Sequence, residues 1–203
     1  MFRLEDVVAE PTTRQRILDT ALDSFGTRGL DGTSLDALAR ELGLRKQSIL
    51  YHFKSKNALF GAVLDEAANL FIEELDQVVK GEDVWEQVEG TVRIVFRLAV
   101  QRPALLGLLR EASRPGSTVA VQLSSRLSGY IDAAQASLEA ALDEGRVAGD
   151  DARLLLFSLY STIMGVATEV EVSRAMGIEP TLRNLAQRRG ELLRFLKVAL
   201  APR

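Results

Sequence analysis

The chain has 203 residues and a formal net charge of −3, and it contains one histidine and no cysteine. A chain of this length can bury a substantial core, while the lack of cysteine excludes disulfides, thiolate nucleophiles and Cys-ligated zinc. The sequence also has no P-loop, no Gly-rich dinucleotide loop and no HExxH motif. We therefore expect no cofactor and no metal site, and an enzyme is the less favoured class of protein.

The first residues, MFRLEDVVAEPTTRQ, lack the basic segment and the continuous apolar segment of a signal peptide. The most apolar stretch covers residues 154–172, and it is too polar to cross a bilayer. The polar residues that interrupt it are Ser158, Ser161, Thr162 and Glu169. We expect a cytoplasmic protein that makes no contact with a membrane.

Apolar residues recur along the chain at spacings of three and four, which is typical of amphipathic helices and predicts an all-α fold. The first predicted helix begins at residues 12–13 and ends near Gly29. The second begins with Thr33 as its N-cap and ends at Gly43. A short third helix follows over residues 45–51, and two short helices around one glycine indicate a helix-turn-helix.

Six further helices follow, separated by Gly and Pro residues. Their approximate ranges are 55–79, 84–102, 104–112, 118–144, 151–175 and 181–200. We therefore predict about nine helices in two domains. The first is a three-helix domain over residues 1–55, and the second is a larger helical domain over residues 56–203.

The stretch from Arg40 to Lys56 holds five basic residues and one acidic residue, although the chain as a whole is acidic. Such a confined basic region is what binding to DNA phosphates requires. The first turn of the third helix carries long polar side chains, as a helix that contacts base edges in the major groove must. These candidate base contacts are Arg45, Lys46, Gln47 and Ser48. The candidate phosphate contacts around them are Thr33, Tyr51, His52 and Lys56.

At these residues the chain resembles the tetracycline-repressor (TetR) family of regulators. The resemblance lies in TSLDALARELGL over residues 33–44, then in Lys46, Ile49, YHF over 51–53, SK over 55–56 and LF over 59–60. It implies that Thr33 anchors a phosphate, that residues 46–48 face the groove, and that His52 and Lys56 clamp the DNA backbone.

The chain departs from the family pattern at Arg45, where the family commonly has Ser or Thr, and at Gln47, where it commonly has a small residue. It departs again at Leu50, where the family commonly has tyrosine. Either Tyr51 makes the phosphate contact of that tyrosine, or the contact is lost and Leu50 only packs.

The predicted helix over residues 151–175 is apolar around most of its circumference, so it must be buried on several sides. Together with the amphipathic helix over 181–200, it predicts a four-helix seam between two copies of the chain, as the family resemblance also implies. The alternative is that both helices complete the core of one protomer. The candidate interface residues are Tyr160, Met164, Ala167, Leu185, Arg189, Leu192 and Leu196.

The helices between residues 55 and 144 are expected to enclose the mainly apolar pocket where regulators of the resembled family usually bind an effector. The candidate ligand contacts are Phe96, Leu109, Leu127, Tyr130, Ser158 and Thr162. A small, mainly hydrophobic effector would suit these residues.

The sequence thus predicts a homodimeric regulator that binds a palindromic operator in double-stranded DNA, with repression favoured over activation. An unknown small-molecule effector would release it from the operator. Two alternatives stay open. One is a DNA-binding dimer that responds to a protein partner and to no small ligand, and the other is a small helical enzyme.

Overall fold

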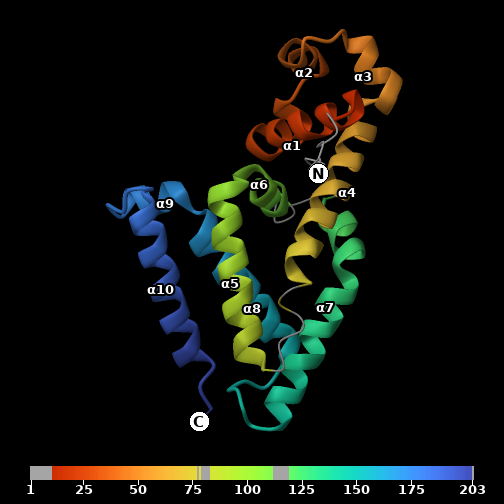
Figure 1. Ribbon diagram of the computed structural model, residues 1–203. Coiled ribbons are helices and arrows are strands. Elements are labelled where there is room, and N and C mark those ends of the chain that lie inside the picture. Colours follow the sequence, from red (N-terminus) through yellow and green to blue (C-terminus); the bar gives the residue numbers. More distant parts are fainter. Residues whose placement is uncertain (1–10, 77, 79–82, 112–118, 203) are drawn as a thin grey trace, which may run out of the picture.

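The structure, a computed structural model, describes residues 11–76, 78, 83–111 and 119–202. Within these residues the chain forms ten α-helices and no strand, which confirms the predicted all-α fold (Figure 1). The helices are α1 (Thr13–Gly32), α2 (Leu35–Leu42), α3 (Lys46–Phe53), α4 (Lys56–Leu75), α5 (Val84–Gln101), α6 (Pro103–Glu111), α7 (Val119–Asp143), α8 (Ala152–Thr168), α9 (Val170–Ala175) and α10 (Leu182–Ala199). Among the described residues, no helix is both long and apolar enough to span a membrane.

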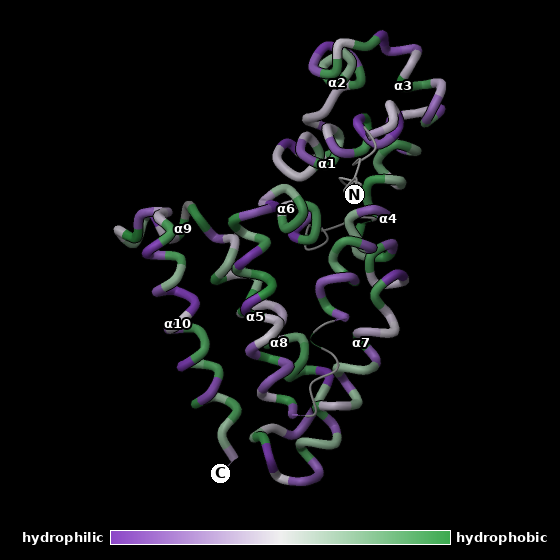
Figure 2. Tube along the Cα trace, in the orientation of Figure 1, coloured by the Kyte–Doolittle hydropathy of each residue, from purple (hydrophilic) through white to green (hydrophobic). Residues whose placement is uncertain are grey.

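The helices α1, α2 and α3 lie together at one end of the molecule, and α4 runs from them into a larger helical body (Figure 1). In the body, α7 contacts both α4 and α8, while α10 packs on α5 and α8. Figure 2 shows polar and apolar stretches alternating along α5, α7 and α10, as expected for helices with one buried side. Residues 1–10 of the predicted first domain lie outside the described residues.

The beginning of α2 differs from the prediction. Ser34, and not Thr33, is the N-cap residue, because its hydroxyl accepts a hydrogen bond of 3.1 Å from the backbone N–H of Ala37. Thr33 instead follows the last residue of α1, and its hydroxyl donates to the carbonyl of Gly29 at 2.9 Å. The predicted cap was wrong because Thr33 is buried with only 2% of its surface exposed, so its hydroxyl bonds within α1.

The turn between α2 and α3 agrees with the prediction. Gly43 ends α2 in the left-handed conformation, with φ 68° and ψ 27°. Its N–H donates to the carbonyl of Arg40, and the N–H of Leu44 donates to Ala39 at 2.8 Å. These bonds satisfy carbonyls at the end of the helix, and glycine adopts this conformation without the cost that a Cβ would add.

The predicted single helix over residues 151–175 is divided at Glu169, which has φ −79° and ψ 73°. Arginines from two other helices bond carbonyls in the last turn of α8. Arg110 of α6 donates to Thr168 at 3.5 Å and lies 4.0 Å from the Glu169 carboxylate, while Arg188 of α10 donates to Val166. The sequence pattern could not reveal this break, because the bonding partners lie far away along the chain.

The helices α1 and α6 cross with their backbones in direct contact. A Cβ atom added to Gly26 would overlap the carbonyl oxygen of Ala104, and one added to Gly107 would overlap the carbonyl oxygen of Gly26. Both positions therefore require glycine because of the neighbouring backbone. This crossing joins the N-terminal helices to the body.

We predict that Gly26→Ala destabilises the protein by about 1–3 kcal/mol, because the added methyl group must push α6 away from α1. Urea unfolding followed by circular dichroism measures the change in free energy. Gly129→Ala is the matched control, since a Cβ there meets no atom within 4 Å. In the interior of α7 this substitution should stabilise the helix by up to about 1 kcal/mol. Equal stability of the two variants would contradict the close crossing.

Candidate nucleic-acid interface

The first turn of α3 presents polar side chains on its outer side and apolar side chains on its inner side. Ile49 and Phe53 are buried in the core and fix the orientation of the helix. Of the four predicted base contacts, three are exposed and one is half-buried. These are Arg45, Lys46, Gln47 and Ser48, in that order. The structure therefore brings these residues together at the start of one short helix.

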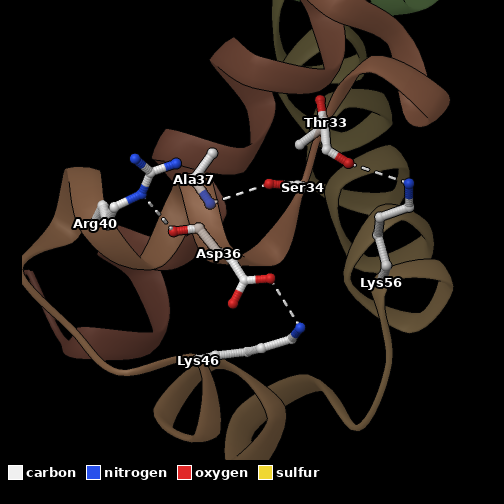
Figure 3. Close-up of polar contacts among 7 residues, drawn as sticks. All are labelled: Thr33, Ser34, Asp36, Ala37, Arg40, Lys46 and Lys56. Carbon is white, nitrogen blue, oxygen red and sulfur yellow. Dashed lines mark hydrogen bonds and ion pairs between the residues drawn. The ribbon is translucent and has the colours of Figure 1, made fainter.

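The first turn of α3 is linked to the first turn of α2 by an ion pair. The ammonium of Lys46 lies 2.9 Å from the Asp36 carboxylate, and the two side chains are 44% and 65% exposed (Figure 3). The backbone carbonyl of Asp36 accepts a longer hydrogen bond of 3.4 Å from the Arg40 guanidinium. The sequence analysis singled out Lys46 but missed its partner, because ten residues separate the two along the chain.

The aromatic residues on α3 divide between core and surface. Phe53 is buried, whereas Tyr51 is 84% exposed and its ring lies 5.3 Å from that of the half-buried His52. Leu50 is half-buried and packs against the core. Of the two residues that the sequence left in question, Leu50 therefore packs and Tyr51 presents its phenol to solvent.

Two of the residues predicted to contact phosphates, Thr33 and Lys56, form hydrogen bonds to backbone carbonyls inside the protein. The hydroxyl of Thr33 is buried and bonded to Gly29, as described above. The ammonium of Lys56 donates to the carbonyls of Leu30 at 2.8 Å and of Thr33 at 3.1 Å (Figure 3). Carbonyls near the end of a helix carry partial negative charge and bind a nearby cation, so Lys56 has a structural role, while its phosphate contact and that of Thr33 stay predictions. Lys56 thus connects the start of α4 to the end of α1.

Polar and basic residues that the sequence analysis did not select also surround α3. Ser34 is exposed at the start of α2, and Lys54 is exposed just after α3. The guanidinium of Arg14 lies 5.1 Å from the centre of the Phe53 ring, which brings the start of α1 next to α3. Ser34 was missed because the neighbouring Thr33 was predicted to be the cap residue.

The predicted ligand contacts do not gather around one cavity. Phe96 and Leu109 are buried in the core, Leu127 is half-buried on α7, and Ser158 is exposed on α8. The phenol of Tyr130 donates to the Asp76 carboxylate at the end of α4, and this hydrogen bond raises the pKa of Tyr130.

Thr162 is the predicted ligand contact that lines a groove between α8 and α10. The other lining residues are Val166, Gly177, Ile178, Asn184, Gln187, Arg188, Glu191, Leu192 and Phe195. The predicted pocket lies elsewhere, among the helices that precede α8. Ser158 does not line this groove: it is exposed on α8, and its hydroxyl donates to the carbonyl of Leu154 within the helix.

The predicted interface residues also separate into two groups. Four of them are buried inside the protomer, where α10 packs on α8 and α5, as the alternative of a completed core expects. They are Met164, Ala167, Leu192 and Leu196. Tyr160 and Arg189 are exposed, and Leu185 is half-buried.

The same two helices expose large apolar side chains that the sequence analysis did not select. Leu154 and Phe157 project from α8, and Leu182, Phe195 and Val198 project from α10. Phe157, for example, exposes 66% of its surface. The sequence pattern does not distinguish the buried apolar residues of α8 and α10 from the exposed ones, because both the inner and the outer sides of these helices are apolar.

Comparisons with known proteins agree with this arrangement. Residues 17–63 match the family described as bacterial regulatory proteins, tetR family. The chain is 25% identical over 150 residues to the HTH-type transcriptional regulator RutR of Escherichia coli (strain K12), which covers 73% of this chain and 71% of that protein. It is 26% identical over 84 residues to the biofilm operon icaADBC HTH-type negative transcriptional regulator IcaR of Staphylococcus epidermidis, covering 41% and 44% of the two chains.

Solved structures share the fold over nearly the whole chain. AibR in complex with isovaleryl coenzyme A and operator DNA matches with a TM-score of 0.74 and 20% identity, covering 94% of this chain and 99% of that one. The regulator FadR from Bacillus subtilis in complex with stearoyl-CoA matches with a TM-score of 0.71 and 18% identity, covering 91% and 97%.

A helix-turn-helix carried on an all-helical body of this shape defines a class of DNA-binding transcriptional regulators. Within that class, residues 17–63 match the tetR family of bacterial regulatory proteins, and the chain is similar to a regulator of transcription over 150 residues.

We predict that Lys56→Met destabilises the protein by about 1–2 kcal/mol, because the carbonyls of Leu30 and Thr33 lose a charged donor. Thermal or urea unfolding measures the loss. Lys54→Met is the matched control: it removes the same charge from an exposed position, and its effect should stay within about 0.5 kcal/mol. If both variants were equally stable, the ammonium of Lys56 would have no structural role.

Proposed function

We propose that this regulator represses transcription by binding a palindromic operator as a homodimer through the first turn of α3. The observation that carries this proposal is the exposed polar turn of Arg45, Lys46 and Gln47, held in place by the buried side of the same helix. A glutamine side chain can pair with adenine, and arginine or lysine can pair with guanine, in the major groove. The description of the relative IcaR as a negative regulator supports repression.

The residues around α3 supply contacts to the DNA backbone in this proposal. Tyr51 offers an exposed phenol on the surface of α3, and His52 lies beside it. Ser34 and Lys54 are exposed at the start of α2 and the end of α3. Such contacts fix the position of the protein on the duplex without reading its sequence.

We further propose that the body forms the dimer through the apolar outer side of α8 and α10. Monomeric proteins rarely expose several large apolar residues on two neighbouring helices, and Phe157 and Phe195 are both largely exposed here. A twofold dimer would place two copies of α3 about one helical turn of DNA apart, which matches a palindromic operator. The division into a DNA-binding domain over residues 1–55 and an effector and dimerisation domain over 56–203 follows this proposal.

The third part of the proposal is a small, mainly hydrophobic effector that binds the body. Two proteins of similar fold are described with isovaleryl coenzyme A and with stearoyl-CoA, which supports an effector with an acyl chain. Such a ligand would favour a dimer in which the two α3 helices no longer match the operator. The crossing of α1 and α6 connects the body to the DNA-binding helices. In a DNA-binding assay, an effector of this kind would be recognised by release of the operator.

We predict salt-dependent binding to one palindrome in the DNA that flanks the gene of this protein, measured by fluorescence anisotropy at several salt concentrations. The double variant Lys46→Ala, Gln47→Ala should lose affinity by tenfold or more, since each base contact contributes about 1–3 kcal/mol. The matched control is Gln101→Ala, Arg102→Ala, which removes a neighbouring glutamine and cation from an exposed position in the body. Equal loss in both variants, or no binding even at low salt, would contradict recognition through α3.

We predict that the protein is dimeric and that Phe157→Glu weakens the dimer on the order of a hundredfold, because a twofold interface would bury two unpaired carboxylates. Sedimentation equilibrium over a range of concentrations measures the dissociation constant. Val121→Glu, at a residue equally exposed on α7, should leave the dimer intact. A wild-type monomer, or a Phe157→Glu variant as dimeric as wild type, would rule out this interface.

A further inference from the structure

The strongest feature that the proposed function does not use is the ion pair between Asp36 and Lys46 (Figure 3). We propose that Asp36 is a specificity-determining residue, which holds Lys46 for contact with a base and penalises binding to DNA of unrelated sequence. This inference rests on the proposed function, because it concerns how α3 distinguishes its operator from other DNA.

The position of the pair gives it this role. Asp36 lies in the first turn of α2, and Lys46 is the first residue of α3. The carboxylate points across the turn between the two helices toward the ammonium, at 2.9 Å (Figure 3). A negative charge is thus fixed at the place where α3 would enter the major groove.

At the start of α3, a lysine without an acidic partner would weaken the discrimination between operator and unrelated DNA. Its flexible side chain can reach a phosphate on any duplex, and each phosphate neutralised adds affinity that does not depend on sequence. The paired Lys46 must give up Asp36 to neutralise a phosphate. The freed carboxylate would then repel the same DNA backbone.

A base contact does not require the pair to break. The ammonium has further N–H groups besides the one directed at Asp36, and these can donate to the neutral acceptors N7 and O6 of guanine. The pair therefore costs more affinity on unrelated DNA than on an operator with guanine at the matching position. Exposed cations nearby, Arg45 and Lys54, supply the attraction that does not depend on sequence.

The test compares the full-length wild type, Asp36→Asn, Lys46→Gln and the double variant on two duplexes of equal length. One duplex contains the operator, and the other has an unrelated sequence. On the unrelated duplex, Asp36→Asn should bind about two- to fivefold tighter, as expected for releasing an exposed ion pair. The slope of log K against log salt should steepen by about 0.9 for each α3 bound. On the operator the gain in affinity should be smaller, so the ratio of operator affinity to unrelated-DNA affinity falls.

Two controls separate this role from a change in net charge. In the Lys46→Gln background, Asp36→Asn should tighten binding to both duplexes alike and leave the ratio of the two affinities unchanged, because it removes only the repulsion of the carboxylate and releases no lysine. Asp23→Asn removes the same charge from an exposed position on α1 and should leave the ratio unchanged. Asp36→Glu, which keeps the carboxylate, should retain the wild-type ratio and shows that the fold tolerates a change at this residue.

The inference is overturned if Asp36→Asn leaves binding to unrelated DNA unchanged. It is equally overturned if Asp23→Asn lowers the ratio of operator affinity to unrelated-DNA affinity by as much, or if Asp36→Asn still lowers that ratio without Lys46. A wild-type protein that binds both duplexes equally would instead overturn the proposed function, and the inference with it.

Discussion

The arrangement of the molecule depends on the crossing of α1 and α6, where two backbones touch without intervening side chains. Glycine at positions 26 and 107 permits this contact, and no larger residue fits at either one. The crossing sets where α1 lies on the body. The helix α2 packs on α1, and α3 packs on α2 and α4, so the same crossing influences where the polar turn of α3 points.

The fold could be predicted from the sequence because helix periodicity and helix-ending residues are local signals. Gly43 is an example, since a left-handed residue between two short amphipathic helices needs glycine wherever the helices lie. The break at Glu169 could not be predicted, because it coincides with hydrogen bonds from Arg110 and Arg188 on other helices. The crossing at Gly26 was missed for the same reason.

The candidate site was predictable in its location and less so in its roles. The exposed turn at residues 45–47 follows from local polarity, because an apolar face at Ile49 and Phe53 must turn inward. Lys56 shows the limit of such reasoning, since nothing in the sequence indicates that the end of α1 lies within reach of its ammonium. Met164 and Phe157 are both apolar and lie on the same helix, so only the packing of the neighbouring helices on α8 separates core from surface.

At the end of α8, hydrogen bonds connect this helix to both α10 and α6. Arg188 attaches α10 to it and Arg110 attaches α6, and α6 in turn touches α1 through bare backbone. At most helix contacts, side chains can change rotamer and absorb a small movement. Two backbones in direct contact cannot adjust in this way. A displacement of α6 caused at the end of α8 would therefore be passed on to α1.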